Sequence, residues 1–211
     1  MDSSQRGGIR VTAVVLAGGR ASRMGGADKG LIPFAGETLA ARAVRRISRS
    51  VDRVLVSANR NLDAYAKLRV PVVPDVLDGF LGPLAGVHAA MVSLGADEGM
   101  QAVFTLPCDC PFFPEDCADR LREALEAHPE ASCAVACADG LRQPTFALYR
   151  LGLKGAIEEF LKSDGRRIGQ FLREHGAIEV GFEDLSAFDN LNTPQELEDA
   201  QNKKESLKNS A

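Results

Sequence analysis

The chain has 211 residues, 45% of them hydrophobic, with a net charge of −4 at pH 7. This length allows one domain with a substantial core that needs no metal or disulfide for stability. The acidic balance gives no general attraction to nucleic acid or to anionic membranes. No apolar run approaches the roughly 20 residues of a membrane span, and the polar start lacks a signal-peptide core. We therefore expect a cytoplasmic protein without nucleic-acid or membrane partners.

The cysteines point to a reduced protein. Their number is odd, and they do not form the framework of a secreted domain. They are Cys108, Cys110, Cys117, Cys133 and Cys137. No C-x-x-C pair occurs, although zinc sites usually place ligands at such short intervals. The alternating apolar segment around Cys133 and Cys137 favours small buried side chains over metal ligands.

Short apolar strands alternate with helical segments along the chain, which predicts a mostly parallel sheet with helices on both faces. The predicted strands are residues 11–17, 54–58, 70–73, 102–106, 133–138, 145–149 and 178–182. The predicted helices are residues 38–50, 61–68, 83–94, 114–128, 153–162, 167–174 and 194–204. We expect a single doubly wound α/β domain over residues 11–201. A flexible segment, residues 1–10, precedes it, and a frayed tail, residues 202–211, follows it.

The loop after the first predicted strand combines glycines with basic residues. Residues 18–29 hold four glycines, two arginines and a lysine. Glycine lets the backbone approach an anion closely, and successive N–H groups form an anion-binding nest. Arg20, Arg23 and Lys29 add charges suited to phosphate. The loop matches neither a P-loop, because Gly30 follows Lys29, nor the G-x-G-x-x-G fingerprint. It predicts triphosphate binding; the alternative is a flexible turn with solvated charges.

Polar residues also follow the next three predicted strands: Ser57 and Asn59 the second, Asp75 the third and Asp109 the fourth. In open α/β sheets, ligands bind at the carboxyl ends of the strands. Asp109 lies between two prolines, a rigid setting for a Mg²⁺ ligand, although a turn residue is the alternative. Asp75 can accept guanine N–H groups or be an ordinary turn residue. Ser57 and Asn59 can contact base or ribose, or cap the next helix.

The sequence offers no covalent nucleophile. The histidines, His88, His128 and His175, lie far apart and lack nearby ligands at metal spacing. No Gly-x-Ser-x-Gly elbow and no Ser/His/Asp set is present. We therefore expect chemistry that relies on the positioning of substrates and on charge.

Several segments together carry a family resemblance. They are Leu16-Ala17-Gly18-Gly19, Arg23-Met24-Gly25-Gly26-x-Asp28-Lys29-Gly30, Gly82-Pro83-Leu84-Ala85-Gly86, Pro107-x-Asp109-x-Pro111 and Asn190-x-Asn192-Thr193-Pro194. They resemble the molybdenum cofactor guanylyltransferases of the nucleotidyltransferase superfamily, over about residues 11 to 201. The resemblance implies a Rossmann-like nucleotidyltransferase fold. It also implies transfer of GMP from GTP to the terminal phosphate of molybdopterin, with release of pyrophosphate.

Site roles follow from this resemblance and from the strand-end positions. The predicted GTP-binding residues are Leu16, Ala17, Gly18, Gly19, Lys29, Ser57, Asn59, Asp75 and Asp109. The predicted catalytic residues are Lys29, Arg23 and Asp109, with Mg²⁺ as the cofactor on Asp109. The predicted molybdopterin side comprises Arg20, Arg166, Arg167, Asn190 and Asn192. The alternative for Arg166 and Arg167 is a solvated helix start.

Two departures from the family pattern affect recognition rather than phosphate chemistry. Ser57 stands where some relatives have Asn, and Gln143 replaces a His often found before the following proline. The preference for guanine over cytosine rests on the resemblance alone. Cytidylyl transfer, and nucleotidyl transfer to another small phosphate, are therefore alternatives. A carrier that binds GTP without turnover is a further alternative. We expect a monomer that meets molybdenum insertion proteins and chaperones of apo-molybdoenzymes.

Overall fold

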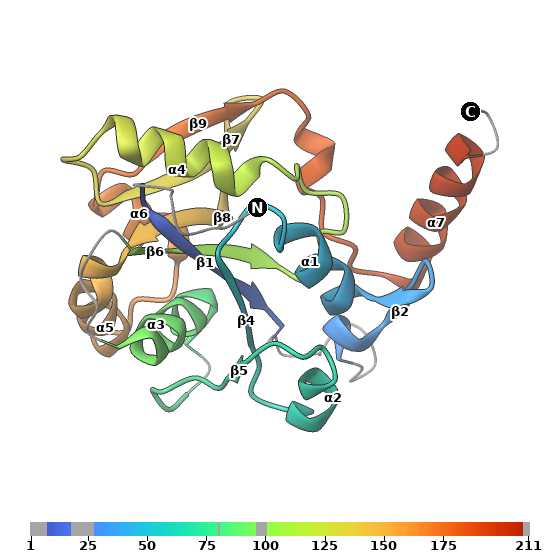
Figure 1. The fold of residues 1–211 in the computed structure, drawn as a ribbon, viewed down its shortest axis with the longest axis horizontal. Coiled ribbons are helices and arrows are strands. Elements are labelled where there is room, and N and C mark those ends of the chain that lie inside the picture. Colours follow the sequence, from blue (N-terminus) through green and yellow to red (C-terminus); the bar gives the residue numbers. More distant parts are fainter. Residues whose placement is uncertain (1–7, 18–27, 80, 96–100, 209–211) are drawn as a thin grey trace.

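The computed structural model describes residues 8–17, 28–79, 81–95 and 101–208, except for the side chains of residues 194 and 203–208. Figure 1 shows how the elements are arranged around a central sheet. No helix in these ranges is long and apolar enough to cross a membrane.

The central sheet has seven strands in the order β5-β4-β1-β6-β8-β7-β9. They are β1 (Arg10–Leu16), β4 (Arg53–Ser57), β5 (Val72–Val73), β6 (Gln101–Pro107), β7 (Cys133–Ala138), β8 (Leu141–Arg150) and β9 (Ile178–Phe182). Every neighbouring pair is parallel except those of β8, which is antiparallel to β6 and β7. The predicted mostly parallel α/β sheet is confirmed. β8 runs opposite to β7 because Asp139 and Gly140, both with positive φ, form a two-residue hairpin turn between the two strands.

Helices cover both faces of the sheet. They are α1 (Leu39–Ile47), α2 (Leu62–Ala66), α3 (Pro83–Leu94), α4 (Cys117–Ala127), α5 (Lys154–Lys162), α6 (Ile168–Glu174) and α7 (Pro194–Lys208). Side chains of α1, α2 and α4 share one buried cluster, and those of α3, α5 and α6 share a second. Along β1, Val11, Ala13 and Val15 belong to the first cluster and Val14 to the second. This alternation is the period of two of a strand buried on both faces.

A small third cluster lies beside the sheet. There the hairpin of β2 (Pro33–Phe34) and β3 (Glu37–Thr38) meets α7, which Figure 1 shows at the edge of the molecule. Phe34 and Leu39 pack there with Leu191 and Leu197. This hairpin was not predicted from the sequence, because two-residue strands are too short to show periodicity. Nor were the 3-10 turns η2 (Lys29–Leu31), η3 (Leu151–Leu153) and η4 (Leu185–Phe188).

Four predicted boundaries need correction, and the others agree within two residues. The start of the first helix is among those that agree: it lies at Leu39, one residue after the predicted one, since Thr38 is the N-cap. The helix ends at Ile47, where the Ser48 hydroxyl donates back to the carbonyl of Val44. The other three corrections concern α4, β8 and α7.

The start of α4 moves from residue 114 to Cys117, after a turn closed by a hydrogen bond to the carbonyl of Pro114. β8 begins at Leu141, before Pro144, because a bulge in the pairing with β7 accommodates that proline. α7 continues to Lys208, beyond the predicted residue 204. Residues 201–208 contain no glycine or proline, so nothing in them ends the helix.

All five cysteines are buried and none of them is in a disulfide, and the burial predicted for Cys133 and Cys137 is confirmed. Burial raises the pKa of each thiol above its ordinary value. They are therefore protonated thiols of the protein interior.

Candidate active site

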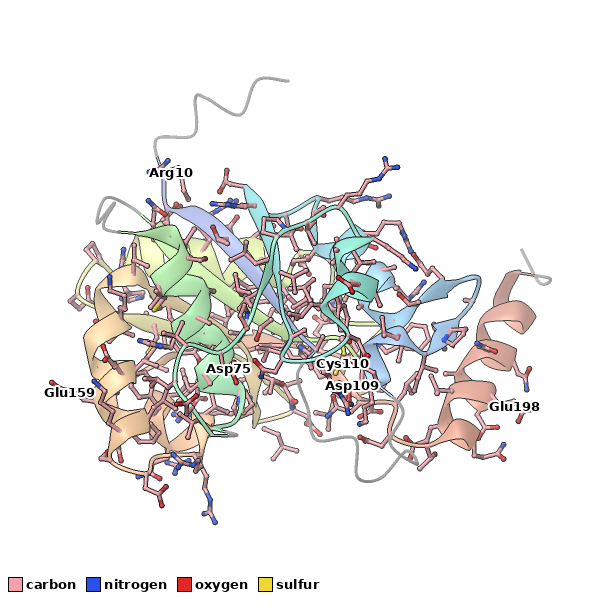
Figure 2. All side chains as sticks on the ribbon, turned by 90° about the horizontal axis from the view of Figure 1, so that it is seen from below. Arg10, Asp75, Asp109, Cys110, Glu159 and Glu198 are labelled. Carbon is pink, nitrogen blue, oxygen red and sulfur yellow. The ribbon has the colours of Figure 1, made fainter. Side chains whose placement is uncertain are left out.

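The polar residues predicted after the strands lie along one edge of the sheet. Leu16, at the end of β1, is level with Ser57 of β4 and with Pro107 of β6. The backbone continues this alignment, because Ala17 donates to the carbonyl of Ser57 over 2.9 Å. Figure 2 shows the labelled Asp75 and Asp109 at this edge. The predicted convergence of loops is therefore confirmed for the described residues after β4, β5 and β6, and for Lys29.

The side chains of Lys29, Asp109 and Asn192 come from distant parts of the chain and meet at the Lys29 amine. Its Nζ donates to Asp109 Oδ2 over 2.9 Å and to Asn192 Oδ1 over 2.6 Å. The side chains of Lys29 and Asp109 are only 26% and 15% exposed. Because the pair is partly shielded from water, its attraction exceeds that of an open surface pair. Lys29, Asp109 and Asn192 are called the Lys29 cluster below.

The segment before α7 is tied to the loop that carries Asp109. The N–H of Leu191 donates to the carbonyl of Asp109 over 2.8 Å. The thiol of Cys110 donates to Asn190 Oδ1 over 2.7 Å. Asn190 and Asn192, both predicted from the C-terminal motif, are thus brought to the site.

The rest of that motif holds the segment in place. Thr193 Oγ1 accepts the N–H of Glu196 over 3.2 Å, and Glu196 Oε2 accepts the N–H of Asn192 over 2.6 Å. Pro194 is the first residue of α7, the position where its missing N–H has no cost. Glu196 was not singled out in the sequence, although its place three residues after Thr193 is typical of a capping box.

A cavity of about 680 Å³ opens beside the Lys29 cluster. It is lined by Gln143, Leu185, Phe188, Asp189, Asn190, Leu191, Asn192, Glu196 and Asp199. Its size is within the range of small-molecule sites. Its lining combines apolar side chains with amide and carboxylate groups, and Asn192 belongs to both the cavity and the Lys29 cluster.

Asn59 and Asp75 form a second polar group at the same edge. Asn59 Nδ2 donates to Asp75 Oδ2, and the N–H of Asp75 donates back to Asn59 Oδ1, each over 2.8 Å. Burial raises the pKa of Asp75, and the hydrogen bond from Asn59 opposes that rise. The alternative role of Asn59 as a helix cap is wrong, because Asn61 occupies the N-cap position of α2. This group is called the Asn59–Asp75 pair.

The glycines of the Gly82–Gly86 segment let α3 approach the sheet edge. A Cβ on Gly86 would lie 2.7 Å from both Leu16 Cδ2 and Ser57 Oγ. Ser57 is consequently buried under α3, with 4% of its surface exposed. Gly82 has a φ of +81° and begins the helix before Pro83.

Two arginines of α1 that were not predicted from the sequence hold the loop after Asp109. Arg42 is buried and its Nε donates to the carbonyl of Pro111 over 3.0 Å. Arg46 donates to the carbonyl of Phe113 over 2.6 Å. Burial lowers the pKa of both guanidinium groups from very high ordinary values. The available signal was two arginines on a helix whose neighbouring positions are apolar.

The remaining predicted residues lie apart from the Lys29 cluster or outside the described ranges. Gly18, Gly19, Arg20 and Arg23 are outside the described residues. Arg166 pairs with Asp164 and donates to the carbonyl of Leu161, and its own backbone carbonyl lies near Gly82. Arg167 is the exposed N-cap of α6. No hydrogen bond or ion pair between described residues joins either arginine to Lys29 or Asp109.

A cation, a carboxylate and an amide lie together at the carboxyl edge of a mostly parallel sheet, which is where open α/β proteins commonly bind their ligands. Comparison with known proteins makes this class specific. The model of the MobA-like NTP transferase domain matches residues 13–178. The chain therefore belongs to the MobA-like NTP transferase family and is a nucleotidyltransferase.

Its relatives cover nearly the full chain. It is 42% identical over 194 residues to the molybdenum cofactor guanylyltransferase of Cupriavidus metallidurans. The aligned residues cover 89% of this chain and 92% of the relative. The chain is 40% identical over 191 residues to that of Shewanella amazonensis, covering 90% and 95%.

Solved structures agree with the fold. Molybdopterin-guanine dinucleotide biosynthesis protein A from Archaeoglobus fulgidus superimposes with a TM-score of 0.75 at 20% identity, covering 92% of this chain and 99% of that one. A 4-diphosphocytidyl-2C-methyl-D-erythritol synthase from Anaerococcus prevotii superimposes with a TM-score of 0.69 at 14% identity, covering 93% and 96%. The predicted Rossmann-like nucleotidyltransferase fold is confirmed.

Proposed function

We propose that the chain transfers GMP from GTP to the terminal phosphate of molybdopterin, forming molybdopterin guanine dinucleotide and pyrophosphate. The names of its relatives at about 40% identity support this activity. The single structural observation that carries it is the Lys29 cluster, which places a cation between a carboxylate and the edge of a cavity.

This transfer depends on alignment of the two substrates and does not require a strong general base. The attacking oxygen of the molybdopterin phosphate is already anionic, and pyrophosphate leaves from the opposite side of the α-phosphorus. Because two anions must be brought together, the rate acceleration comes from positioning of the substrates and neutralisation of their charge. Lys29 can contact both the attacking and the transferred phosphate, because its amine lies where the sheet edge meets the cavity. Arg23, the other predicted catalytic residue, would steady the triphosphate.

Asp109 suits a hard divalent ion such as Mg²⁺. Its carboxylate follows a central strand of the sheet. The amide oxygen of Asn192 accepts a hydrogen bond from Lys29, as the carboxylate of Asp109 does. Magnesium in nucleotide sites is commonly held by one or two carboxylates with phosphate oxygens and water. Bound there, the ion would neutralise charge on the triphosphate.

The two substrates would occupy opposite sides of Lys29. GTP would lie along the ends of β1, β4 and β5, over Leu16, Ala17, Ser57 and the loop containing Gly18 and Gly19. The Asn59–Asp75 pair would face the base, since a carboxylate accepts guanine N–H groups well. Molybdopterin would occupy the cavity next to Asn190 and Asn192. The predicted roles of Arg20, Arg166 and Arg167 on that side are part of this proposal.

The assay is pyrophosphate release with GTP or CTP, each with and without molybdopterin. Release with GTP that requires molybdopterin supports the proposal. Preference for CTP would identify a cytidylyltransferase instead. GTP binding without any release would identify a carrier.

A further inference from the structure

A buried carboxylate directly before Lys29 is held by groups that have no role in the proposed reaction. Asp28 Oδ1 accepts the hydroxyl of Tyr65 over 2.5 Å, and its Oδ2 accepts Asn61 Nδ2 over 2.9 Å. The N–H of Gly30 donates to the same carboxylate over 3.3 Å. Arg60 Nε lies 3.6 Å from Oδ2 and adds a compensating charge. Asp28, Gly30, Asn61 and Tyr65 are called the Asp28 clasp.

The clasp also explains why a glycine follows Lys29. A Cβ on Gly30 would lie 3.1 Å from Tyr65 Cε1 and still closer to the tyrosine hydroxyl. Tyr65 is fully buried, so its ring has no room to retreat. Glycine is therefore required for close packing at this position, where a P-loop would have Ser or Thr.

Lys29 is thus fixed from both of its chain neighbours. Asp28 is anchored on one side, and Gly30 packs against Tyr65 on the other. The turn η2 adds backbone hydrogen bonds from Leu31 to Asp28 and from Ile32 to Lys29, at 3.0 and 3.1 Å. With its backbone held in this way, the lysine side chain extends to Asp109 and Asn192.

We propose that Asp28 and Tyr65 are positioning residues for guanylyl transfer: the clasp aims the Lys29 amine at the phosphates. This rests on the proposed function. Tyr65 acts only through Lys29 and does not touch substrate. Burial and the hydrogen bond to Asp28 raise the pKa of Tyr65 far above its ordinary value, so its hydroxyl stays a donor. A small misplacement of a phosphate-binding amine is costly, because in-line transfer depends on alignment.

The test is Tyr65→Phe, which keeps the buried ring and removes the hydroxyl. We expect kcat to fall about tenfold with KM for GTP within about twofold. Tyr149→Phe is the matched control: Tyr149, the chain's other tyrosine, is as deeply buried but in the cluster on the opposite face. The control should retain full kcat. Asn61→Gly is a second variant, because glycine tolerates the φ of +52° and only the amide is lost.

A double-mutant cycle separates positioning from a structural role. In Lys29→Ala protein, Tyr65→Phe should cause less than about a twofold further loss, because the amine it aims is gone. A full tenfold loss there, or unchanged kcat in both Tyr65→Phe and Asn61→Gly, would overturn the proposal.

A readout without turnover keeps this test independent of the proposed function. The rate of acylation of Lys29 by an amine reagent is measured by mass spectrometry, with Lys154 and Lys162 as internal references. We expect Tyr65→Phe to raise the rate at Lys29 severalfold, because the amine leaves Asp109 and Asn192 more often. If the wild type lacks guanylyl transfer, the proposed function fails, and an unchanged labelling rate at Lys29 separately rejects the clasp.

Discussion

The Lys29 cluster and the Asn59–Asp75 pair lie on the same sheet edge but are built differently. Lys29 joins Asp109 and Asn192, which are 80 and 163 residues away along the chain. Asn59 and Asp75 are only 16 residues apart, and their mutual hydrogen bonds lie near the surface, with Asp75 half-buried. The first group depends on the whole fold, whereas the second depends on two neighbouring strand ends. We infer that the fold secures phosphate chemistry and leaves base contacts easier to change.

If this contrast is right, the largest effect comes from Asp109→Asn, which keeps the side-chain size and removes its charge. We expect Mg²⁺-dependent transfer to fall to background, because both the ion and Lys29 lose their carboxylate. The measurement is kcat over a Mg²⁺ series, with the melting temperature to show that the fold persists. Asp116→Asn, at an exposed aspartate before α4, is the control. Activity with unchanged metal dependence would exclude Asp109 as the ligand.

The next largest effect is expected for Lys29→Ala. Turnover should fall by ~10² to 10³, the scale of losing one preorganised stabilising group. Lys162→Ala removes an exposed lysine paired with Glu158 and should keep the wild-type kcat. A near-normal kcat for Lys29→Ala would remove this residue from the mechanism and end the distinction between the two groups.

The Asn59–Asp75 pair should affect binding rather than turnover. Asp75→Asn is expected to raise KM for GTP about tenfold, the scale of one hydrogen bond to a charged group, with kcat nearly unchanged. Asp78→Asn, an exposed aspartate of the same loop, is the control. A loss confined to kcat would contradict a base-binding role.

The pH dependence sharpens the same prediction. Because burial raises the pKa of Asp75, its carboxylate takes up a proton at a higher pH than an ordinary aspartate does. The ionised form is the better acceptor, so KM for GTP should rise as the pH falls through this raised pKa and stay level above it. In Asp75→Asn, this dependence should disappear. If it persists in the variant, another group titrates.

The smallest effect on chemistry is expected for Gly86→Ala, in the helix that packs against the ends of β1 and β4. The new methyl would meet Leu16 and Ser57 at 2.7 Å, so we expect the free energy of unfolding to fall by about 1–3 kcal/mol. Gly155→Ala, in α5 with open space around it, should instead stabilise by up to about 1 kcal/mol. Urea denaturation of both variants measures this difference, and equal stabilities would contradict the close packing of α3.

Local signals in the sequence were enough to predict the strands of the sheet, its helices and the edge that carries the candidate site. Apolar periodicity located the strands, and the polar residues after them identified the edge. The Asp28 clasp could not be found in this way, because Tyr65 reads as an apolar residue of a short helix until folding brings it to Asp28. Arg42 was missed for a similar reason, since its partner Pro111 is 69 residues away. The C-terminal asparagines were found only through the family resemblance, and nothing in their spacing shows that they reach Lys29.

The most direct measurement is a crystal structure of the protein with a non-hydrolysable GTP analogue and Mg²⁺. We expect the α-phosphate within hydrogen-bond distance of Lys29 Nζ, the ion on Asp109 and the guanine at Asp75. Phosphates bound away from both Lys29 and Asp109 would contradict this expectation.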